Sequence, residues 1–584
     1  MKELKYINKF FVKYKWQLLF GLLITVIATL FKLLVPMKIG DSVNIIRAGI
    51  EGEVTDMDYI KSEMLFNILL IVGATLLSAF LTFLMRQTII VVSRYIEYDL
   101  KNEVYQHYQE LSLSFYKKNR TGDLMNRISE DVSSIRNYAG PALMYGTSTV
   151  TLFIVVITYM FIKAPILTLY TIVPLPILSF AIYKLSIAIH HKSTIVQQYL
   201  SKLTTATQES FSGIRIIKAY GIEGRHYDSF KDLAEKSKDK NIDLAKVQAF
   251  FFPLMLLLIG LSNILVVYIG GRQYIQGSID LGTVVEFLIY VNMLSWPVAS
   301  VGWITSMVQR AEASQKRINE FLNVTPEIKN PNSQAMEIKG DIHFDNVSFV
   351  YPDTGIKALQ NIQLHIKSGE TIAIMGNTGS GKSTLLDLIG RLYDTTHGTL
   401  FIDNVDIKQI NLNSIRNAIG YVPQDSFLFS DTINHNIRFG KIDATQEEIK
   451  EAAKQASVHD NIIGLNKGYD TILGERGITL SGGQKQRVSI ARAFIKDPTI
   501  LLLDDSLSAV DTETEETILN NLKKVSSNKT TLIVSHRVST AKNADRIIVL
   551  ENGKIIQEGS HKQLIETEGY YKDLYAKQLL EKEN

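Results

Sequence analysis

The stretch Leu480-Ser481-Gly482-Gly483-Gln484 precedes an apolar run that ends in two aspartates, Leu501-Leu502-Leu503-Asp504-Asp505. Further upstream, Gly376-Asn377-Thr378-Gly379-Ser380-Gly381-Lys382-Ser383 fits the pattern G-x-x-x-x-G-K-[ST] at every position. An apolar run, Thr371–Met375, leads into this glycine loop, and a helical pattern over 382–392 follows it. Strand, glycine loop and helix in this order let backbone N–H groups surround phosphates. The pattern therefore predicts an α/β domain that binds a nucleoside triphosphate.

Short apolar runs with the pattern of strands recur through the second half of the chain. They cover Ile342–Val350, Thr371–Met375, Ile500–Leu503 and Thr531–Val534. Helical patterns separate them, including one over Gln484–Ile495. Apolar strands that alternate with helices predict a parallel sheet with both faces covered.

The bulk composition separates two kinds of sequence. A chain of 584 residues is expected to hold two or more domains. Its hydrophobic content is 46%, high for a soluble protein, and the excess lies in the first half. A net charge of +3 is too small to favour a nucleic-acid partner. The absence of cysteine excludes disulfides, thiolate metal sites and thiol nucleophiles.

The first half contains six apolar windows long enough to cross a bilayer, which needs about 20 residues. The windows are Gln17–Val35, Met64–Met85, Ala139–Ile162, Pro165–Tyr183, Val247–Gly271 and Leu281–Gln309. A buried soluble helix is the alternative for any single window, but six windows in one half-chain favour membrane spans.

Basic residues set the expected orientation, because they concentrate on the cytoplasmic side. Five lysines, Lys2, Lys5, Lys9, Lys13 and Lys15, precede the first span. The loop 93–138 is also basic, whereas the outer loop 36–63 is mostly acidic. We therefore expect a multi-pass plasma-membrane protein with its amino terminus and its carboxyl-terminal domain in the cytoplasm. The inner loops 93–138 and 184–246 are helical in pattern, and ~20 descending residues would reach ~30 Å below the membrane. The expected domains are residues 1–322 in the membrane, a linker over 323–336, and a nucleotide-binding domain over 337–584.

The phosphate loop and the paired aspartates predict specific chemistry. Lys382 is expected to reach the β- and γ-phosphates, and the Ser383 hydroxyl to ligate Mg²⁺. Asp504 ends a strand where a carboxylate helps to hold Mg²⁺; a helix-capping aspartate is the alternative. Asp505 takes the position of a general base that orients the attacking water. Its carboxylate is drawn back by roughly 1.3 Å relative to a glutamate, and a misplacement of about 1 Å can cost about 100-fold in rate. Asp505 is expected to be a poor base, unless local backbone shifts compensate.

Three further residues are candidates for the same site. His536 follows the strand Thr531–Val534, and a neighbouring strand would place it beside Asp505 near the γ-phosphate. Gln424, between the glycine loop and Leu480, is a candidate Mg²⁺ ligand; a solvated loop amide is the alternative. Tyr351 is a candidate for stacking on adenine, with a core tyrosine as the alternative.

The stretch Leu480–Gln484 is glycine-rich and opens a helix, so it is a second phosphate-binding helix end. Since the chain already has one phosphate loop, this second helix end suits a nucleotide that another copy of the domain holds.

Together these motifs resemble those of ATP-binding cassette (ABC) exporters, in the half-transporter form that fuses one membrane domain to one nucleotide-binding domain. In that resemblance Tyr351 matches the adenine-stacking position, Gly376–Ser383 with Thr384 the Walker A loop, and Gln424 the Q-loop. Leu480, Ser481, Gly482, Gly483 and Gln484 match the signature, Asp504 the Walker B carboxylate, Asp511 the D-loop and His536 the switch histidine. The stretches Phe115–Leu124 and Gly213–Glu223 resemble the inner loops that carry coupling helices.

The resemblance covers nearly the whole chain. It implies a six-helix transmembrane domain followed by an α/β P-loop domain with an antiparallel β subdomain and a helical subdomain. It also implies ATP and Mg²⁺ as cofactors, ATPase activity coupled to transport, a lipid bilayer, and a second ABC half-transporter as partner.

Asp505 departs from the family pattern, because the catalytic glutamate of the family is an aspartate here. Heterodimeric members commonly carry such a change in one chain, whose own site then hydrolyses ATP weakly. The resemblance thus implies efflux of amphipathic drugs or related hydrophobic compounds by one half of a heterodimer. A homodimeric lipid or peptide exporter and an ATP-gated channel or receptor are the alternatives.

Glu286 is a carboxylate inside the last span, and charges at that depth are commonly functional. It could attract cationic substrates; a carboxylate paired with another helix is the alternative.

Overall fold

The computed structural model describes residues 2–331, 334–474, 477, 479–507, 512–526 and 528–583. It divides into two compact units, of which the first comprises Met1–Gln109 and Gly122–Val324. The second unit comprises Glu110–Thr121 and Thr325–Asn584. The short segment 110–121 thus belongs to the second unit although the sequence pattern places it within the membrane domain.

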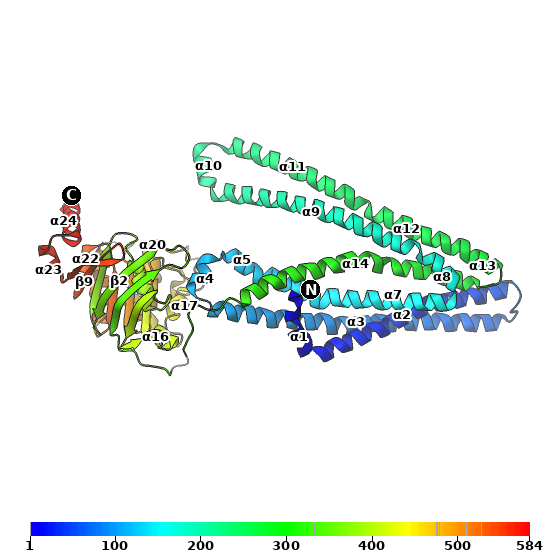
Figure 1. Cartoon of the computed structure of the whole chain (residues 1–584), viewed down its shortest axis with the longest axis horizontal. Coiled ribbons are helices and arrows are strands. Elements are labelled where there is room, and N and C mark those ends of the chain that lie inside the picture. Colours follow the sequence, from blue (N-terminus) through cyan, green and yellow to red (C-terminus); the bar gives the residue numbers. More distant parts are fainter. Residues whose placement is uncertain are drawn as a thin grey trace. The chain divides into compact units, whose positions relative to one another are not determined.

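The first unit is built from helices (Figure 1). They are η1 (Glu3–Ile7), α1 (Asn8–Lys13), α2 (Lys15–Ile50), α3 (Met57–Glu110), α5 (Thr121–Asn126), η2 (Arg127–Asp131), α6 (Val132–Asn137), η3 (Tyr138–Ala142), α7 (Leu143–Lys163), α8 (Pro165–Ile172), α9 (Pro174–Ser212), α10 (Ile214–Tyr220), α11 (Glu223–Ala249), α12 (Phe251–Leu265), η4 (Val266–Gly270), α13 (Gly271–Ile275) and α14 (Leu281–Leu322). Among the described residues, six helical stretches are long and apolar enough to cross a membrane, and each contains one of the predicted windows.

The region 36–63 is mostly helical, which corrects the expected outer loop. Helix α2 continues through Pro36 to Ile50, and α3 begins at Met57. Charged side chains do not end a helix when neighbours three or four residues apart pair. Lys38 and Asp41 form such a pair at 2.7 Å, and Arg47 pairs with Glu51 at 3.2 Å.

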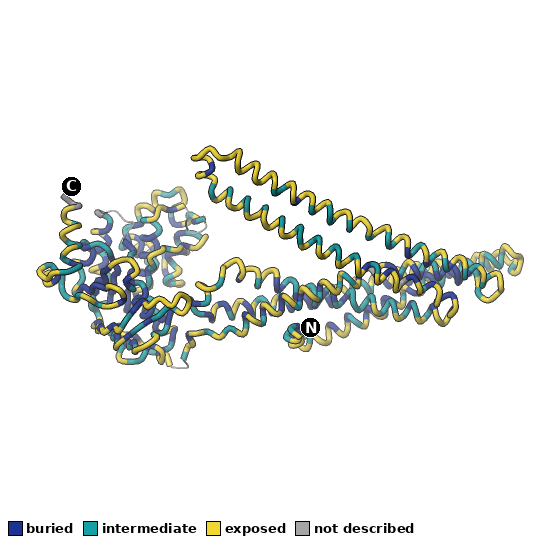
Figure 2. The backbone as a smooth tube through the Cα atoms, turned by 45° about the horizontal axis from the view of Figure 1, so that its top comes forward, coloured by how far each residue is buried: buried dark blue, intermediate teal, exposed yellow. Residues whose placement is uncertain are grey.

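The core of the first unit lies where α2, α7, α8 and α14 pack. Phe287 and Tyr290 of α14 are fully buried there beside Met160 of α7. By contrast, α9 and α11 form a long hairpin whose far end, around α10, is largely exposed (Figure 2).

The second unit contains two sheets. The first is antiparallel, in the order β2-β1-β4-β5, from β1 (Ile342–Val350), β2 (Lys357–Ile366), β4 (His397–Ile402) and β5 (Val405–Asp406). The second has the order β10-β9-β3-β8-β7-β6, from β3 (Thr371–Gly376), β6 (Ile419–Val422), β7 (Ile500–Asp504), β8 (Thr530–Val534), β9 (Arg546–Glu551) and β10 (Lys554–Gly559). Its strands are parallel except β10.

Helices cover these sheets and add a helical subdomain. They are α4 (Leu113–Lys118), α15 (Lys382–Ile389), α16 (Leu412–Ala418), α17 (Ile433–Arg438), α18 (Gln446–Gln455), α19 (His459–Ile463), η5 (Gly468–Asp470), α20 (Gly482–Phe494), α21 (Thr512–Val525), α22 (Val538–Ala541), α23 (His561–Glu566) and α24 (Tyr570–Glu583). One apolar core joins α15 to both sheets, a second joins α17, α18, α20 and α21 to β7, and a third joins α22 and α24 to β3 and β9.

The four predicted strands match β1, β3, β7 and β8 to within one residue at each end, because each is a continuous or alternating apolar run. Helix α15 ends at Ile389, earlier than the pattern suggests, since Gly390 closes it and Arg391 adopts a left-handed φ of 46°. Register pairs Ile374 of β3 and Asp504 of β7 with the same residue of β8, Val534. The carboxyl ends of these three parallel strands therefore meet at one edge of the sheet.

Candidate functional site

The glycine loop joins β3 to α15 at that edge. Gly381 has a left-handed φ of 102° and is the residue from which α15 starts. A side chain there would collide with the carbonyl oxygen of Ala358, so the position requires glycine. The Ser380 hydroxyl is buried and has no hydrogen-bond partner among the residues that the structure describes. A buried donor without a partner inside a loop of this shape fits a phosphate oxygen.

Lys382 is held in place before any phosphate binds. Its ammonium donates to the carbonyl oxygens of Gly376 at 2.9 Å and Asn377 at 2.8 Å, and only 7% of the residue is exposed. Burial lowers the pKa of Lys382, and the neighbouring charges of Asp505 and Asp504 oppose that shift. The two carboxylates thus favour the protonated, positively charged form of Lys382 at the mouth of the loop.

Ser383 and Asp504, two predicted Mg²⁺ ligands, are in contact. The Ser383 hydroxyl donates to Asp504 Oδ1 at 3.1 Å, and Asp504 is 3% exposed at the end of β7. Burial raises the pKa of Asp504, and the Ser383 hydrogen bond lowers it. Gln424 lies exposed in the loop after β6, and no hydrogen bond joins it to Ser383 or Asp504 among the described residues.

The donor set fits Mg²⁺ held mainly by nucleotide phosphates. No cluster of three acidic or histidine side chains forms a metal site in the described part of the chain. Mg²⁺ commonly uses one or two protein oxygens together with substrate phosphates. One carboxylate and one hydroxyl beside the phosphate loop supply such a set.

Asp505 and His536 follow neighbouring strands and meet at the same edge. The Asp505 N–H donates to the Val534 carbonyl at 3.1 Å, and its φ is 44°. Aspartate tolerates this left-handed backbone better than most residues. His536 is half-buried, and burial and Lys382 lower its pKa, whereas Asp505 and Asp504 raise it. Lys382, both aspartates and His536 therefore lie within electrostatic reach of one another.

Tyr351 follows β1 next to the phosphate loop. Its hydroxyl is 2.8 Å from the hydroxyl of Thr384, and its ring meets those of Phe349 and Tyr393 edge to face. The ammonium of Lys117, from α4, lies 4.7 Å from the centre of the Tyr351 ring. This is a cation–π contact with the ring that is predicted to stack on adenine.

Sequence reasoning missed two residues near this site. Lys117 is one of the basic residues of the loop 93–138, and no local sequence signal brings it to Tyr351. Asp387 lies one turn after Ser383 on the same face of α15, a spacing the sequence displays. Burial raises its pKa to about 6, and the Tyr421 hydroxyl donates to its Oδ1 at 3.4 Å.

The signature forms the exposed start of α20. The Ser481 hydroxyl accepts from the Gln484 N–H at 3.3 Å, and the Gln484 side chain accepts from the Ser481 N–H at 3.0 Å. This reciprocal cap fixes the first turn. Ser481 and Gly482 are exposed, whereas Leu480 is buried beneath them. Asp511 and the rest of the predicted D-loop lie outside the described residues.

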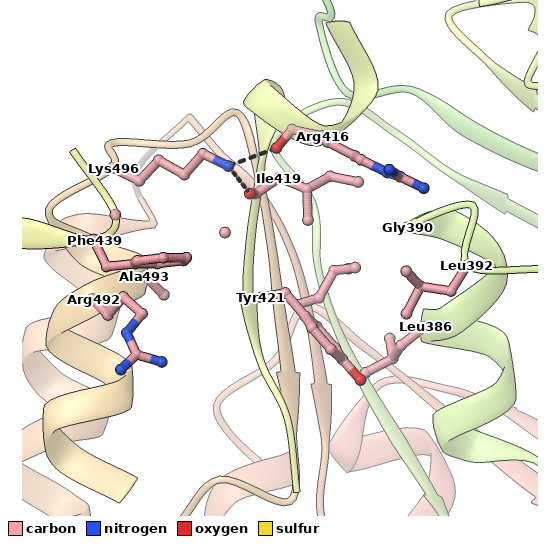
Figure 3. Close-up of a pocket in the computed structure, with 13 residues that line it drawn as sticks. Leu386, Gly390, Leu392, Arg416, Ile419, Tyr421, Phe439, Arg492, Ala493 and Lys496 are labelled. Atoms are coloured by element: carbon pink, nitrogen blue, oxygen red, sulfur yellow. Dashed lines mark hydrogen bonds between the residues drawn. The ribbon is translucent and has the colours of Figure 1, made fainter. Parts of the chain in front are cut away.

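A cavity of about 280 Å³ opens beside β6, between α15 and α20, and Figure 3 shows it. Lys496 donates to the carbonyl oxygens of Arg416 at 2.5 Å and Ile419 at 2.7 Å at one end of it. None of the predicted site residues lines it.

Glu286 lies within helix packing in the first unit. It is 1% exposed, and its side chain covers Gly40 of α2 so closely that a Cβ there would collide with it. The Tyr159 hydroxyl of α7 donates to Glu286 Oε2 at 3.4 Å. Three aromatic residues of the spans, Phe250, Phe252 and Trp296, are each more than two-thirds exposed.

Comparisons with known proteins agree with this architecture. Residues 18–298 match the family model "ABC transporter transmembrane region", and residues 359–508 match "ABC transporter". The chain is 35% identical to the multidrug resistance-like ATP-binding protein MdlA of Escherichia coli, covering 97% of this chain and 95% of that one. It is 38% identical to the ATP-dependent lipid A-core flippase of Syntrophus aciditrophicus, over 83% and 80% of the two chains.

A solved structure of a bacterial Atm1-family ABC exporter with ATP bound superposes with a TM-score of 0.80 at 28% identity. The match covers 96% of this chain and 99% of that one. With six helices among the described residues that are long and apolar enough to cross a membrane, and with its ATPase domain, the chain belongs to the ABC transporter family, in the exporter form that fuses both parts.

Proposed function

We propose that this chain is one half of an ATP-driven exporter in the plasma membrane, with its amino terminus and its nucleotide-binding domain in the cytosol. The basic residues before α2 and in the loop 93–138 support that orientation. ATP binding draws two nucleotide-binding domains together, and hydrolysis releases them. The six spans of each half follow this cycle by opening alternately to the two sides of the membrane.

The observation that carries the proposal is the pairing of a preformed phosphate loop with an exposed signature helix. Lys382 and the Ser380 hydroxyl belong to a loop that already has its phosphate-binding shape. The first turn of α20 offers a second set of N–H groups at Gly482 and Gly483. The phosphate loop already supplies the N–H groups that bind this chain's own ATP. The signature therefore binds the nucleotide that a partner chain holds.

The chain's own residues act on the phosphates in distinct ways. Lys382 binds the β- and γ-phosphates, and His536 donates to the γ-phosphate. Asp505 orients the attacking water. Ser383, Asp504 and Gln424 would hold Mg²⁺, which neutralises charge on the phosphates when bound.

We infer that the partner is a different half-transporter. The side chain of Asp505 is one methylene shorter than that of a glutamate, which makes it a poor base. The site built on this chain's Walker motifs therefore hydrolyses ATP slowly. The intact signature of this chain completes the competent site, whose base the partner supplies. A homodimer is the alternative, and it requires Asp505 to serve as the working base in both sites.

We propose amphipathic, hydrophobic compounds as substrates. The resistance-type relative supports drugs, and the lipid A-core flippase makes lipid a second candidate. Trp303 of α14 packs on Tyr145 of α7 with ring centres 5.3 Å apart, and both belong to spans that also contain small hydroxyl residues. Such a mixed surface suits molecules with apolar bodies and a polar end.

Transport into sealed vesicles tests the proposal. Proteoliposomes with outward-facing nucleotide-binding domains should accumulate an amphipathic dye above the external concentration when ATP and Mg²⁺ are added. A non-hydrolysable ATP analogue should support no accumulation. An ATP-gated channel would only equilibrate the dye, which would contradict the exporter. Movement of a fluorescent phospholipid between leaflets, without dye uptake, would favour the lipid candidate.

A further inference from the structure

The backbone around His536 is fixed from several sides. The Ser535 N–H donates to the Ile374 carbonyl of β3 at 3.1 Å. The Ser535 hydroxyl accepts from the Arg537 N–H at 3.0 Å. His536 thus sits where the end of a strand turns into α22.

Glu515 of α21 holds the far side of this turn. It is 1% exposed, and it accepts from the hydroxyls of Thr540 at 2.6 Å and Ser539 at 3.2 Å. It also pairs with the guanidinium of Arg537. A buried carboxylate with this many donors is a fixed part of the structure. These contacts are with residues 537, 539 and 540.

Gln578 of α24 makes contact with the peptide of His536 itself. Its Nε2 donates to the His536 carbonyl at 2.9 Å, and its Oε1 accepts from the Val538 N–H at 2.8 Å. One amide therefore bridges the two peptides that flank Arg537. These two hydrogen bonds restrain the backbone on the carboxyl side of His536.

Helix α24 is anchored so that Gln578 reaches this place. Tyr571, two turns earlier on the same face, is fully buried. Its hydroxyl lies 2.7 Å from His561 Nδ1, and its N–H donates to Gln557 Oε1 at 3.1 Å. The helix is thus a rigid support rather than a trailing end.

We propose that Gln578 is a positioning residue that aims His536 at the γ-phosphate of the nucleotide on this chain. The proposal rests on the proposed function, in which His536 contacts that phosphate. It predicts that the carboxyl-terminal helix contributes to the discrimination of ATP from ADP, since only ATP carries the γ-phosphate.

The test compares binding of ATP and ADP at this chain's own site, because binding does not depend on whether that site hydrolyses ATP. In the assembled transporter, 2-azido-ATP labels this chain, and ATP or ADP competes. Gln578→Met removes both hydrogen bonds and keeps the length and the helix propensity of the side chain. Gln578→Glu keeps only the acceptor for Val538. Lys577→Ala, at the exposed neighbouring position, is the matched control.

His536→Ala should lower the preference for ATP over ADP by about 10-fold or more, the value of a charge-assisted hydrogen bond. Gln578→Met and Gln578→Glu should each lower it by about 3- to 10-fold through a misplaced donor, with ADP binding unchanged. Lys577→Ala should leave it unchanged. Equal weakening of ATP and ADP, or an effect that Lys577→Ala shares, would overturn the positioning role. An unchanged preference in His536→Ala would instead refute the assignment of His536 in the proposed function.

Discussion

Replacing Lys382 with alanine tests the phosphate loop most simply. The ammonium uses two of its three N–H donors on the Gly376 and Asn377 carbonyls, at 2.9 and 2.8 Å. The third donor is available to a phosphate oxygen without rearrangement. A hydrogen bond to a charged group contributes about 1.5 to 3 kcal/mol. Its loss should therefore raise the Kd for ATP about 10- to 150-fold.

The upper end of this range is expected, because Asp504 and Asp505 lie close to the same ammonium. Without Lys382, two carboxylates would face the incoming phosphates with less compensation. Competition against 2-azido-ATP labelling of this chain measures the effect, and Lys357→Ala, an exposed lysine of β2, is the control. Unchanged ATP affinity at this site in Lys382→Ala would refute the assignment of the loop.

Three further predictions follow from named groups. Asp505→Glu should speed hydrolysis at this chain's own site by up to about 100-fold. The measurement is the amount of labelled ADP trapped on this chain. No gain would show that Asp505 is already well placed. Glu286 is buried in helix packing and only 1% exposed, so Glu286→Gln should change the vesicle uptake of cationic and neutral dyes alike; a loss confined to cationic dyes would show that Glu286 selects charge. Burial raises the pKa of Asp387 to about 6. The folded protein therefore holds this proton more tightly than the unfolded chain does, which stabilises the fold below about pH 4. That stabilisation is lost as the pH rises through 6. Asp387→Asn should therefore stabilise the transporter by up to about 3 kcal/mol at pH 8 and have little effect at pH 4, which thermal melting at the two pH values would show; a pH-independent shift would contradict the buried carboxylate.

Local sequence patterns were sufficient for much of the fold. The strands β1, β3, β7 and β8 and the glycine loop are local signals, since each depends on residues adjacent in the chain. The six spans follow from length and hydropathy alone. The helical continuation of α2 to Ile50 was missed, because a run of charges resembles a loop unless the i, i+3 and i, i+4 pairs are considered.

The sequence predicts which residue types form the candidate site, but not the residues that support them. Lys382, Ser383 and Asp504 belong to motifs whose spacing is fixed, and they meet at one sheet edge. Lys117 and Gln578 belong to no such motif. Each reaches the site only through folding, from α4 and α24 respectively. Contacts between residues so far apart in the chain have no local sequence signal.

The central claim is that this chain supplies a weak base to one ATP site and an intact signature to the other. The ATPase activity of Asp505→Asn and Gly482→Asp, each in the assembled transporter, tests it most directly. Gly482 is exposed in the first turn of α20, where an aspartate favours the helix dipole, so the substitution should not unfold the domain. Its carboxylate would repel the γ-phosphate held by the partner. The account predicts that Asp505→Asn keeps most of the activity and Gly482→Asp loses most of it, whereas equal and severe losses would contradict the unequal pair.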